Sequence, residues 1–218
     1  MIKKDIPFFA ETLDNMFPDA ETELYYDNEF QLLIAILMSA QATDKQVNKV
    51  NRNFFNFLKT PQDGIDMWVE EIKEFIDSIS FYNNKAENIV KTCHLIINEY
   101  NSKIPKTIEE LIKLNWVGIK TAKVFLAVTE DAPYIGVDTH VHRVLNRLWL
   151  VNTKTPNETD KKISSGFTKD NHSMLHNTLV LFWRYQCIAR KPKCESCPFQ
   201  EKCKYYKKVF LKEQKKLS

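Results

Sequence analysis

The fold of this chain is read most directly from LNWVGIKTAKVFLAV, residues 114–128. The segment has the pattern of a helix end, a tight turn over 115–118 and a second, largely apolar helix. A glycine directly before a helix lets backbone N–H groups approach a phosphate closely, and Gly118 holds that position. Lys120 stands in the first turn of the second helix, where the partial positive charge of a helix N-terminus favours an acidic residue instead. Taken alone, the segment also fits an ordinary corner between two helices with an exposed lysine.

The remaining sequence is helical in pattern almost throughout, and no alternating run is long enough to predict a strand. Residues 60–76 read as one helix, and Asn84 with Glu87 predicts the start of another. The least helical segment, EDAPYIGV at 130–137, predicts a crossing between two subdomains. Further helix starts are predicted where a threonine stands three residues before an acidic or amide side chain: Thr43 with Gln46, Thr60 with Asp63 and Thr107 with Glu110.

Composition is that of an ordinary globular protein, with 218 residues, 44% hydrophobic and 27% charged. The longest apolar run, Leu32 to Met38, is far too short to span a bilayer, and no signal-peptide core follows the N-terminus. We therefore expect a cytoplasmic protein. Residues 184–218 carry a net charge of +8, against −5 for the rest of the chain. This asymmetry predicts contact with a polyanion near the C-terminus, although a solvated lysine-rich tail fits about as well.

Four cysteines lie close together in CIARKPKCESCPFQEKC. The cysteines are Cys187, Cys194, Cys197 and Cys203, with gaps of six, two and five residues. Four thiolates in one short loop-rich segment predict a metal site before they predict disulfides. The spacing leaves zinc and an iron–sulfur cluster both open, because only one CxxC pair is present and the gaps differ from the ferredoxin run. We expect a structural clip that holds Arg190, Lys191 and Lys193 toward phosphate, and a helix-packing role for Cys93.

The segment IGVDTHVHRV places Asp138 directly before a predicted helix, where it fits an N-cap. Such a cap does not exclude a part in catalysis. His140 and His142 are two residues apart and do not share a helix face, so they do not predict a metal site. His172 and His176 are four apart and do share one, but no third ligand is apparent nearby, and we expect a surface pair.

Five blocks together resemble the endonuclease III family of DNA glycosylases: LLIAILMSAQATDKQVNK, YNNKAENIVKTC, VGIKTAKV, VDTHVHRVLNRL and CIARKPKC. They lie between residues 32 and 203, in the family's order. The resemblance implies an all-α, two-lobed helix-hairpin-helix fold with a C-terminal four-cysteine cluster loop. Residues 22–132 would form a six-helix lobe with the helix-hairpin-helix at about 107–129. Residues 1–21 and 133–218 would form the second lobe, with an iron–sulfur loop at 187–203.

The resemblance also implies a [4Fe–4S] cluster on the four cysteines and duplex DNA in the cleft between the lobes. Lys120 and Asp138 would face each other across that cleft. The implied activity is that of a bifunctional DNA glycosylase and AP lyase of base excision repair that removes oxidised pyrimidines. An amine at a helix start with apolar neighbours should lose its proton readily and attack C1′ of a flipped nucleotide. A Schiff base on Lys120 would then lead to β-elimination 3′ of the abasic site, with Asp138 stabilising positive charge on the sugar.

Other positions carry over from the same resemblance. Gln41 matches the residue that fills the gap left by the flipped base, although it also fits a polar linker between helices. Phe81 lies at the family's apolar wedge, and a core aromatic is nearly as good an interpretation. Val117 and Gly118 of the hairpin would contact phosphates. So would the lysine and arginine side chains of the cluster loop: Arg190, Lys191 and Lys193.

The chain departs from the family pattern in the hairpin, where Asn115 and Trp116 replace the usual Pro-Gly, and at Ser80, where a Gly is usual. Trp116 should need an unusual backbone conformation and weaken the contact between hairpin and phosphate. Two alternatives remain: an adenine-specific glycosylase of the same superfamily, which has no lysine at the nucleophile position, and a non-catalytic Fe–S or zinc DNA-binding protein. We expect a nucleoid-associated monomer that binds DNA with damaged pyrimidines or abasic sites and no membrane.

Overall fold

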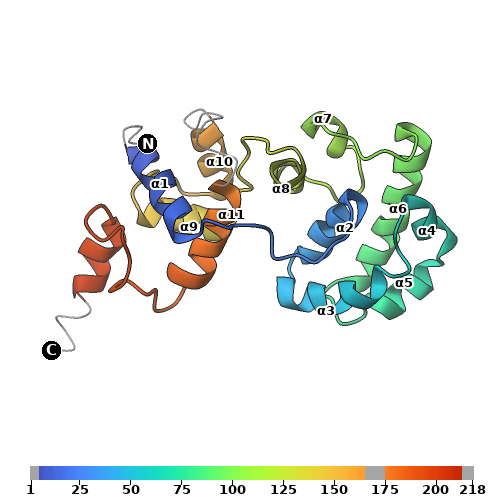
Figure 1. Ribbon diagram of the computed structural model, residues 1–218, viewed down its shortest axis with the longest axis horizontal. Helices are drawn as coiled ribbons and strands as arrows, with labels where there is room; N and C mark the ends of the chain where they lie inside the picture. The colour runs from blue at the N-terminus through green and yellow to red at the C-terminus, as the bar shows by residue number, and fades with distance from the viewer. Residues whose placement is uncertain (1–4, 165–174, 213–218) are drawn as a thin grey trace. The chain divides into compact units, whose positions relative to one another are not determined.

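The computed structural model describes residues 5–164 and 175–212, and within these ranges the chain forms helices and no strands (Figure 1). This confirms the all-α fold class. The helices are α1 (Ile6–Met16), α2 (Glu29–Ser39), α3 (Asp44–Phe54), α4 (Pro61–Asp66), α5 (Val69–Ile76), α6 (Tyr82–Tyr100), α7 (Ile108–Leu111), α8 (Ile119–Thr129), α9 (Thr139–Arg147), α10 (Pro156–Ser164) and α11 (Leu175–Leu181). Two π-helical turns follow, η3 (Phe182–Gln186) and η4 (Tyr206–Phe210). No described helix is long and apolar enough to cross a membrane.

The chain divides into two compact units. The hairpin unit is Thr22–Glu130, and the cysteine unit combines Met1–Glu21 with Asp131–Ser218. Each unit has its own buried residues, so each is described by itself below.

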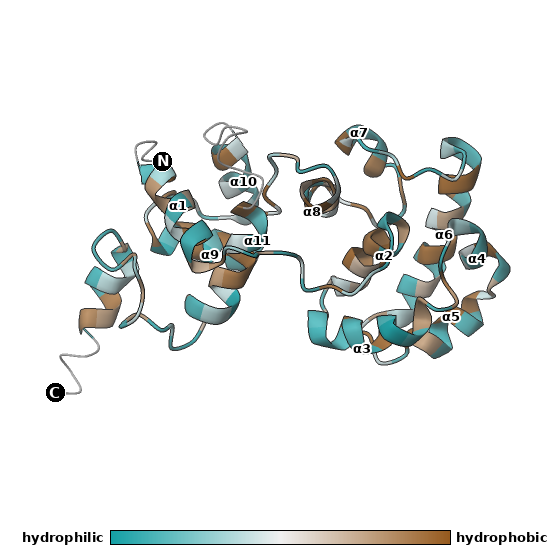
Figure 2. Cartoon of the chain, in the orientation of Figure 1, coloured by the Kyte–Doolittle hydropathy of each residue, from teal (hydrophilic) through white to brown (hydrophobic). Residues whose placement is uncertain are grey.

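The hairpin unit is built around α2, in which nine of eleven residues are buried. Helices α3, α6 and α8 pack against α2, and α4 and α5 pack along α6 (Figure 1). Figure 2 shows brown, hydrophobic ribbon along α2 and α8. Gly64 in α4 has no room for a side chain, because a Cβ there would lie 2.4 Å from Sγ of Cys93 in α6. Cys93 is fully buried, which confirms its expected packing role.

Three predicted helix starts are confirmed. Thr43 and Thr60 each form a capping box with the residue three positions later, Gln46 and Asp63. Thr107 Oγ1 accepts a hydrogen bond from the backbone N–H of Glu110, at the start of α7. These caps satisfy N–H groups that have no partner within the helix.

Two expectations about helix boundaries are wrong. The helix α6 begins at Tyr82 rather than near Asn84, because Phe81 takes a left-handed conformation with φ 60° and starts the helix without a side-chain cap. Residues 60–76 form two helices rather than one. The break lies at Met67 and Trp68, whose ψ angles of 132° and 147° are extended.

The cysteine unit packs α1, α9 and α11 around one hydrophobic core. Phe199, from the segment between the last two cysteines of the loop, is part of this core. Its ring lies 5.2 Å from that of Phe9 in α1 and 5.3 Å from that of Phe182 in η3. The cysteine-rich loop is therefore fixed to the core by an aromatic side chain.

His176 lies inside the cysteine unit, and the expectation of a surface histidine is wrong. Its side chain is 6% exposed, and its Nδ1 accepts a hydrogen bond from Gly136 N–H at 3.3 Å. Its expected companion, His172, lies outside the described residues. The hydrogen bond explains why a polar ring is tolerated here, since buried polar groups need a partner.

Candidate functional site

The hairpin turn between α7 and α8 has the unusual backbone that the sequence predicts. Trp116 has φ 64°, in the left-handed region, and its side chain is 45% exposed. Leu114 and Val117 on either side of it are buried and hold the turn against the unit. Thr92 Oγ1 in α6 donates to the carbonyl of Asn115 at 3.2 Å, and this hydrogen bond ties the turn to α6.

Gly118 is the N-cap of α8, with φ −88° and no side chain to satisfy the first helical N–H groups. A Cβ placed at Gly118 would meet nothing within 4 Å. The packing of this chain therefore does not require a glycine here. The open space beside this helix N-terminus is instead suited to a group from outside the chain, such as a phosphate.

Lys120 lies in the first turn of α8, and its side chain is exposed. This corrects the expectation of apolar surroundings. The amine therefore stands at the N-terminal end of α8, on the side of the helix that is open to solvent.

Asp44, the first residue of α3, is a neighbour of Lys120 that the sequence interpretation missed. Burial raises the pKa of the Asp44 carboxyl, and the positive charge of Lys120 partly offsets that rise. The sequence signal was present, because Asp44 directly follows the cap Thr43. A first-turn acidic residue is, however, explained just as well by the helix dipole.

Gln41 and Phe81 occupy two exposed tips of the hairpin unit. Gln41 lies in the turn between α2 and α3 with φ 58°, and Phe81 precedes α6 with φ 60°. The Phe81 side chain is 58% exposed, which excludes the alternative of a core aromatic. A left-handed conformation in a residue other than glycine is uncommon and strained.

Asp138 caps α9 in the cysteine unit. Its Oδ1 accepts hydrogen bonds from the backbone N–H groups of His140 and Val141 at 2.9 and 2.8 Å. The expected N-cap is therefore present. These two bonds fix the position and orientation of the carboxylate.

Helix α9 also joins this carboxylate to the cysteine loop. Arg143 Nη2 donates to the carbonyl of Cys187 at 3.1 Å, and its Nη1 lies 2.9 Å from Nδ1 of His140. The His140 ring in turn stacks on Trp183, with centroids 4.2 Å apart. The His140 ring is thus engaged in packing and hydrogen bonding.

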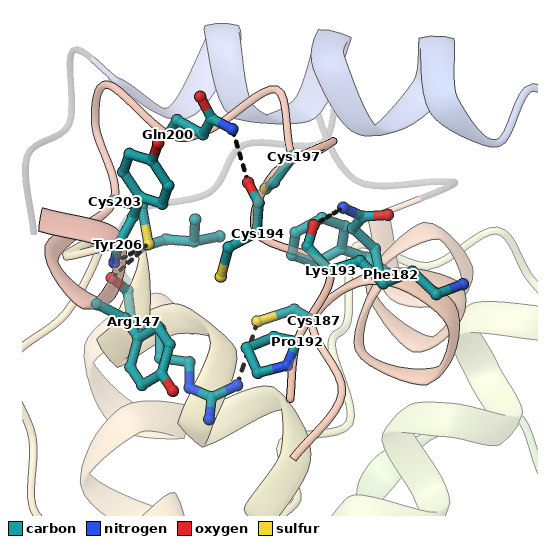
Figure 3. Close-up of a pocket in the computed structure, with 13 residues that line it drawn as sticks. Arg147, Phe182, Cys187, Pro192, Lys193, Cys194, Cys197, Gln200, Cys203 and Tyr206 are labelled. Atoms are coloured by element: carbon teal, nitrogen blue, oxygen red, sulfur yellow. Dashed lines mark hydrogen bonds between the residues drawn. The ribbon is translucent and has the colours of Figure 1, made fainter. Parts of the chain in front are cut away.

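The four cysteines line one pocket, together with Arg147 and Phe182 among others (Figure 3). The cysteines are Cys187, Cys194, Cys197 and Cys203. Among the described residues, no three His, Cys, Asp or Glu side chains are arranged to hold a single metal ion. One zinc ion would draw four sulfurs to about 2.3 Å from a single point, whereas an iron–sulfur cluster binds each thiolate on a different iron. Four thiols on one pocket supply the four thiolate ligands that such a cluster uses.

The thiols are poorly suited to carry charge without a metal. In the protein alone, burial raises the pKa of Cys194 and of Cys197 to about 11, and neighbouring cysteines add to the rise. Burial also raises the pKa of Cys203. Since thiolate is the form that binds metal, a cationic iron centre would have to supply the missing stabilisation.

Hydrogen bonds reach two of the sulfurs. Arg147 Nη1 donates to Sγ of Cys187 at 3.6 Å (Figure 3), and the backbone N–H of Tyr206 donates to Sγ of Cys203 at 3.4 Å. Arg147 is held over the ring of Tyr205 at 4.2 Å. Such donors stabilise negative charge on sulfur, and they tune the potential of a bound cluster.

Three basic residues of the cysteine loop are exposed: Arg190, Lys191 and Lys193. Lys191 has φ 52°, and Gln186 holds the backbone of Lys193 through hydrogen bonds in both directions, with Nε2 donating to its carbonyl at 2.6 Å. The loop therefore presents positive charge on a defined backbone.

Comparison with known proteins agrees with this geometry. Residues 34–169 match the family model of HhH-GPD superfamily base excision DNA repair proteins, and residues 187–203 match the iron–sulfur binding domain of endonuclease III. Endonuclease III of Bacillus subtilis is 40% identical over 92% of each chain. That of Escherichia coli is 40% identical over 88% of this chain and 91% of its own.

Solved structures give the same result. A trapped endonuclease III–DNA covalent intermediate matches with a TM-score of 0.90 and 41% identity, over 96% of this chain and 99% of that one. A non-covalent endonuclease III–DNA complex matches with a TM-score of 0.90 and 40% identity, over 97% and 99%. A thermostable thymine-DNA glycosylase, 23% identical with a TM-score of 0.85, shares the fold.

The hairpin, the four-cysteine pocket and these matches over most of the chain lead to one assignment. The chain binds a [4Fe–4S] cluster and belongs to the endonuclease III family of base excision repair enzymes, which are DNA glycosylases and AP lyases.

Proposed function

We propose that the chain removes oxidised pyrimidines from duplex DNA and cuts the strand at the abasic site, with Lys120 as nucleophile and Asp138 as its carboxylate partner. The observation that carries the proposal is the exposed amine of Lys120 in the first turn of α8, directly after the open N-terminus at Gly118. The capture of a solved relative as a covalent intermediate with DNA supports the covalent route.

The reaction proceeds in four steps. The damaged nucleotide is flipped out of the duplex, because its C1′ cannot be reached inside the stack. The neutral amine of Lys120 attacks C1′, and the C1′–N bond breaks as the base leaves with its electron pair and takes up a proton. The amine loses a proton and the sugar ring opens to give a Schiff base. Removal of a C2′ proton then expels the 3′ phosphate, and water releases the enzyme.

Asp138 stabilises the positive charge that develops on the sugar and accepts or returns protons during these steps. Its two backbone hydrogen bonds hold the carboxylate ready and cost no reorganisation during the reaction. Lys120 and Asp138 lie in different units, and the proposal requires both to act on the same deoxyribose.

The remaining contacts bind and distort DNA. Gln41 fills the gap left by the flipped base, and Phe81 inserts between bases as a wedge. Val117 and Gly118 direct the hairpin backbone at a phosphate. The exposed cations of the loop, Arg190, Lys191 and Lys193, bind further phosphates without reading sequence.

The cluster would be held by Cys187, Cys194, Cys197 and Cys203. When bound, it supplies four metal–thiolate links that fix the loop and its cations. Arg147 orients one of these thiolates through its hydrogen bond to Cys187. Iron content together with a broad visible absorbance is expected, and stoichiometric zinc without iron would contradict the cluster.

Borohydride trapping tests the nucleophile. The protein is incubated with thymine-glycol or abasic duplex DNA and reduced, and a covalent adduct is expected on denaturing gels. Lys120→Ala should abolish the adduct, whereas Lys113→Ala, which removes an exposed lysine of the same hairpin segment, should leave it intact. DNA binding without an adduct in the unmodified protein would favour the non-catalytic alternative, and excision of adenine opposite oxidised guanine would favour the adenine-specific one.

Asp138→Asn tests the carboxylate separately from the cap. Asparagine is an equally good N-cap, so the variant should keep its stability within about 0.5 kcal/mol. The glycosylase rate should nevertheless fall on the order of a hundredfold, because the negative charge beside the reacting sugar is lost. An unchanged rate would remove Asp138 from the mechanism.

We infer further that the chain works as a monomer. We also infer that it acts at the nucleoid in the cytoplasm, because its substrate is chromosomal DNA. Sedimentation with and without duplex should give one chain per DNA site. A stable dimer in both conditions would contradict this.

A further inference from the structure

We propose that Lys85 is a positioning residue that joins the Gln41 and Phe81 tips into one rigid DNA-inserting unit. The inference rests on the proposed function, because it assumes that these two tips enter the duplex. Lys85 lies in the first turn of α6 and is 2% exposed, which is rare for a lysine.

The amine of Lys85 is committed to the end of another helix. Its Nζ donates to the carbonyls of Met38 and Ala40, both at 2.7 Å. Met38 is in the last turn of α2, and Ala40 is its C-cap. The last carbonyls of a helix lack intrahelical partners and carry partial negative charge, so an ammonium there satisfies both needs. No basic residue of α2 itself stands in its last turn.

These bonds fix the residues on which Gln41 depends. Gln41 directly follows Ala40, and the turn is closed by a hydrogen bond from Ala42 N–H to the carbonyl of Ser39 at 3.1 Å. Gln41 is held in the left-handed region, a conformation that persists only when its surroundings impose it. The two carbonyls held by Lys85 lie immediately before that residue.

The same lysine is anchored to the second tip. Its backbone N–H donates to the carbonyl of Phe81 at 3.1 Å, the first hydrogen bond of α6. One residue thus contacts the backbone of the Phe81 tip through its own main chain, and the backbone before Gln41 through its side chain. These hydrogen bonds give the packing of α6 against this end of α2 a direction that apolar contact does not supply.

Two alternative roles fit less well. A second nucleophile would need access to substrate, and this amine is enclosed and bonded to two carbonyls. A purely structural role predicts loss of stability alone, without a specific link to Gln41. Burial lowers the pKa of Lys85 to about 8, so placing a charged amine here is unfavourable for folding.

A double-mutant cycle tests the inference on the full chain. The readouts are the single-turnover excision rate and the fluorescence of 2-aminopurine placed opposite an uncleavable abasic analogue, which reports on the orphan base. Gln41→Ala should change the fluorescence and lower the rate on the order of tenfold. Lys85→Met should do the same, and the double variant should show no further loss, since both act through one side chain.

Matched controls separate positioning from stability. Ile96→Ala removes a buried side chain of α6, remote in sequence from Lys85, and should lower Tm while leaving the fluorescence and the rate unchanged. If Lys85→Met does not fold, the cycle is run with Lys85→Gln, which loses the charge but keeps a polar side chain. Borohydride trapping should remain positive in all of these variants, because Lys120 is intact.

The outcomes are distinct. Additive effects of Lys85 and Gln41, or a Lys85 variant that loses Tm but keeps the fluorescence, would overturn the inference and leave the proposed function standing. An unchanged signal in Gln41→Ala would overturn both the role of Gln41 and the inference. Loss of trapping in the unmodified protein would instead overturn the proposed function.

Discussion

Trp116 affects both the stability of the chain and, we predict, its binding to DNA. It holds a left-handed turn position that glycine adopts freely, and for other residues that conformation costs about 1–2 kcal/mol. The sequence predicted this strain correctly, because turn chemistry is local and readable. The consequence for DNA is not local and remains a prediction.

Trp116→Gly should stabilise the chain by about 0.5–1 kcal/mol, since the relieved strain exceeds the extra entropy of an unfolded glycine. It should also tighten DNA binding across a salt series, because the hairpin backbone could approach the phosphate more closely. Trp149→Gly is the matched control, with φ 65° and 42% exposure in the cysteine unit. It should leave DNA affinity unchanged, and an unchanged affinity for Trp116→Gly would refute the predicted weakness of this hairpin.

A second prediction concerns Lys85 and the pH dependence of the free energy of unfolding. Burial lowers its pKa to about 8, from about 10.5 in the unfolded chain. Between these values the unfolded state binds more protons, so the free energy of unfolding should rise with pH by at most about 1.4 kcal/mol per unit. Denaturant titrations at pH 7.5 and 9.5 should show this rise in the unmodified protein and not in Lys85→Met. Parallel pH dependence in both would show that the amine stays charged.

For single residues, the sequence could not reveal which side chains are buried and which are exposed. Lys120 was expected among apolar neighbours and is exposed, because a helical pattern does not say which face the first turn presents. The burial of Lys85 and of Asp44 was not predicted. Each has an ordinary local explanation, and its partners come from other helices.

Among the helices, local chemistry predicted where several begin. Thr43, Thr60 and Thr107 form their caps because the hydrogen bonds lie within one turn of chain. The prediction failed at Asn84, because α6 begins directly after the left-handed backbone at Phe81 and uses no side-chain cap. A helix start without a capping side chain carries no sequence signature of this kind.

Two glycines, Gly64 inside α4 and Gly118 at the N-cap of α8, lead to opposite predictions. Gly64→Ala would force a Cβ to 2.4 Å from Sγ of Cys93, whereas Gly118→Ala meets nothing within 4 Å. We expect Gly64→Ala to lose about 1–3 kcal/mol of stability with DNA affinity unchanged. Gly118→Ala should lose about 1 kcal/mol or less and weaken DNA binding, because the new methyl group occupies the approach of a phosphate.

Thermal unfolding and a salt series on both variants measure these effects. Cys93→Ala combined with Gly64→Ala is the control, since it removes the clashing sulfur and should recover part of the stability. Equal loss of DNA affinity in the two single variants would show that Gly118 has no special part in binding.

In the whole molecule, the iron–sulfur ligands and their supporting contacts fall within one unit. The cysteine loop, Arg147 and the aromatic anchor Phe199 all belong to the cysteine unit and pack on its core. The motif predicted a four-thiolate site from spacing alone. The choice between zinc and a cluster came from the match of residues 187–203 to the iron–sulfur binding domain of endonuclease III, because the spacing by itself fits both metals.

Loss of one ligand should therefore unfold one unit before the other. Cys197→Ser should lose the visible absorbance and most of the iron, because metal binding that stabilises only the folded state contributes directly to its stability. Hydrogen exchange read by mass spectrometry should show lost protection in Asp131–Ser218, while α2 and α6 of Thr22–Glu130 keep theirs. Cys93→Ala, which removes a thiol outside the pocket, should keep both the iron and the protection. If the hairpin unit instead lost protection together with the cysteine unit, the cluster would have to stabilise the whole chain as one cooperative block, and the separate cores would not behave as independent folding units.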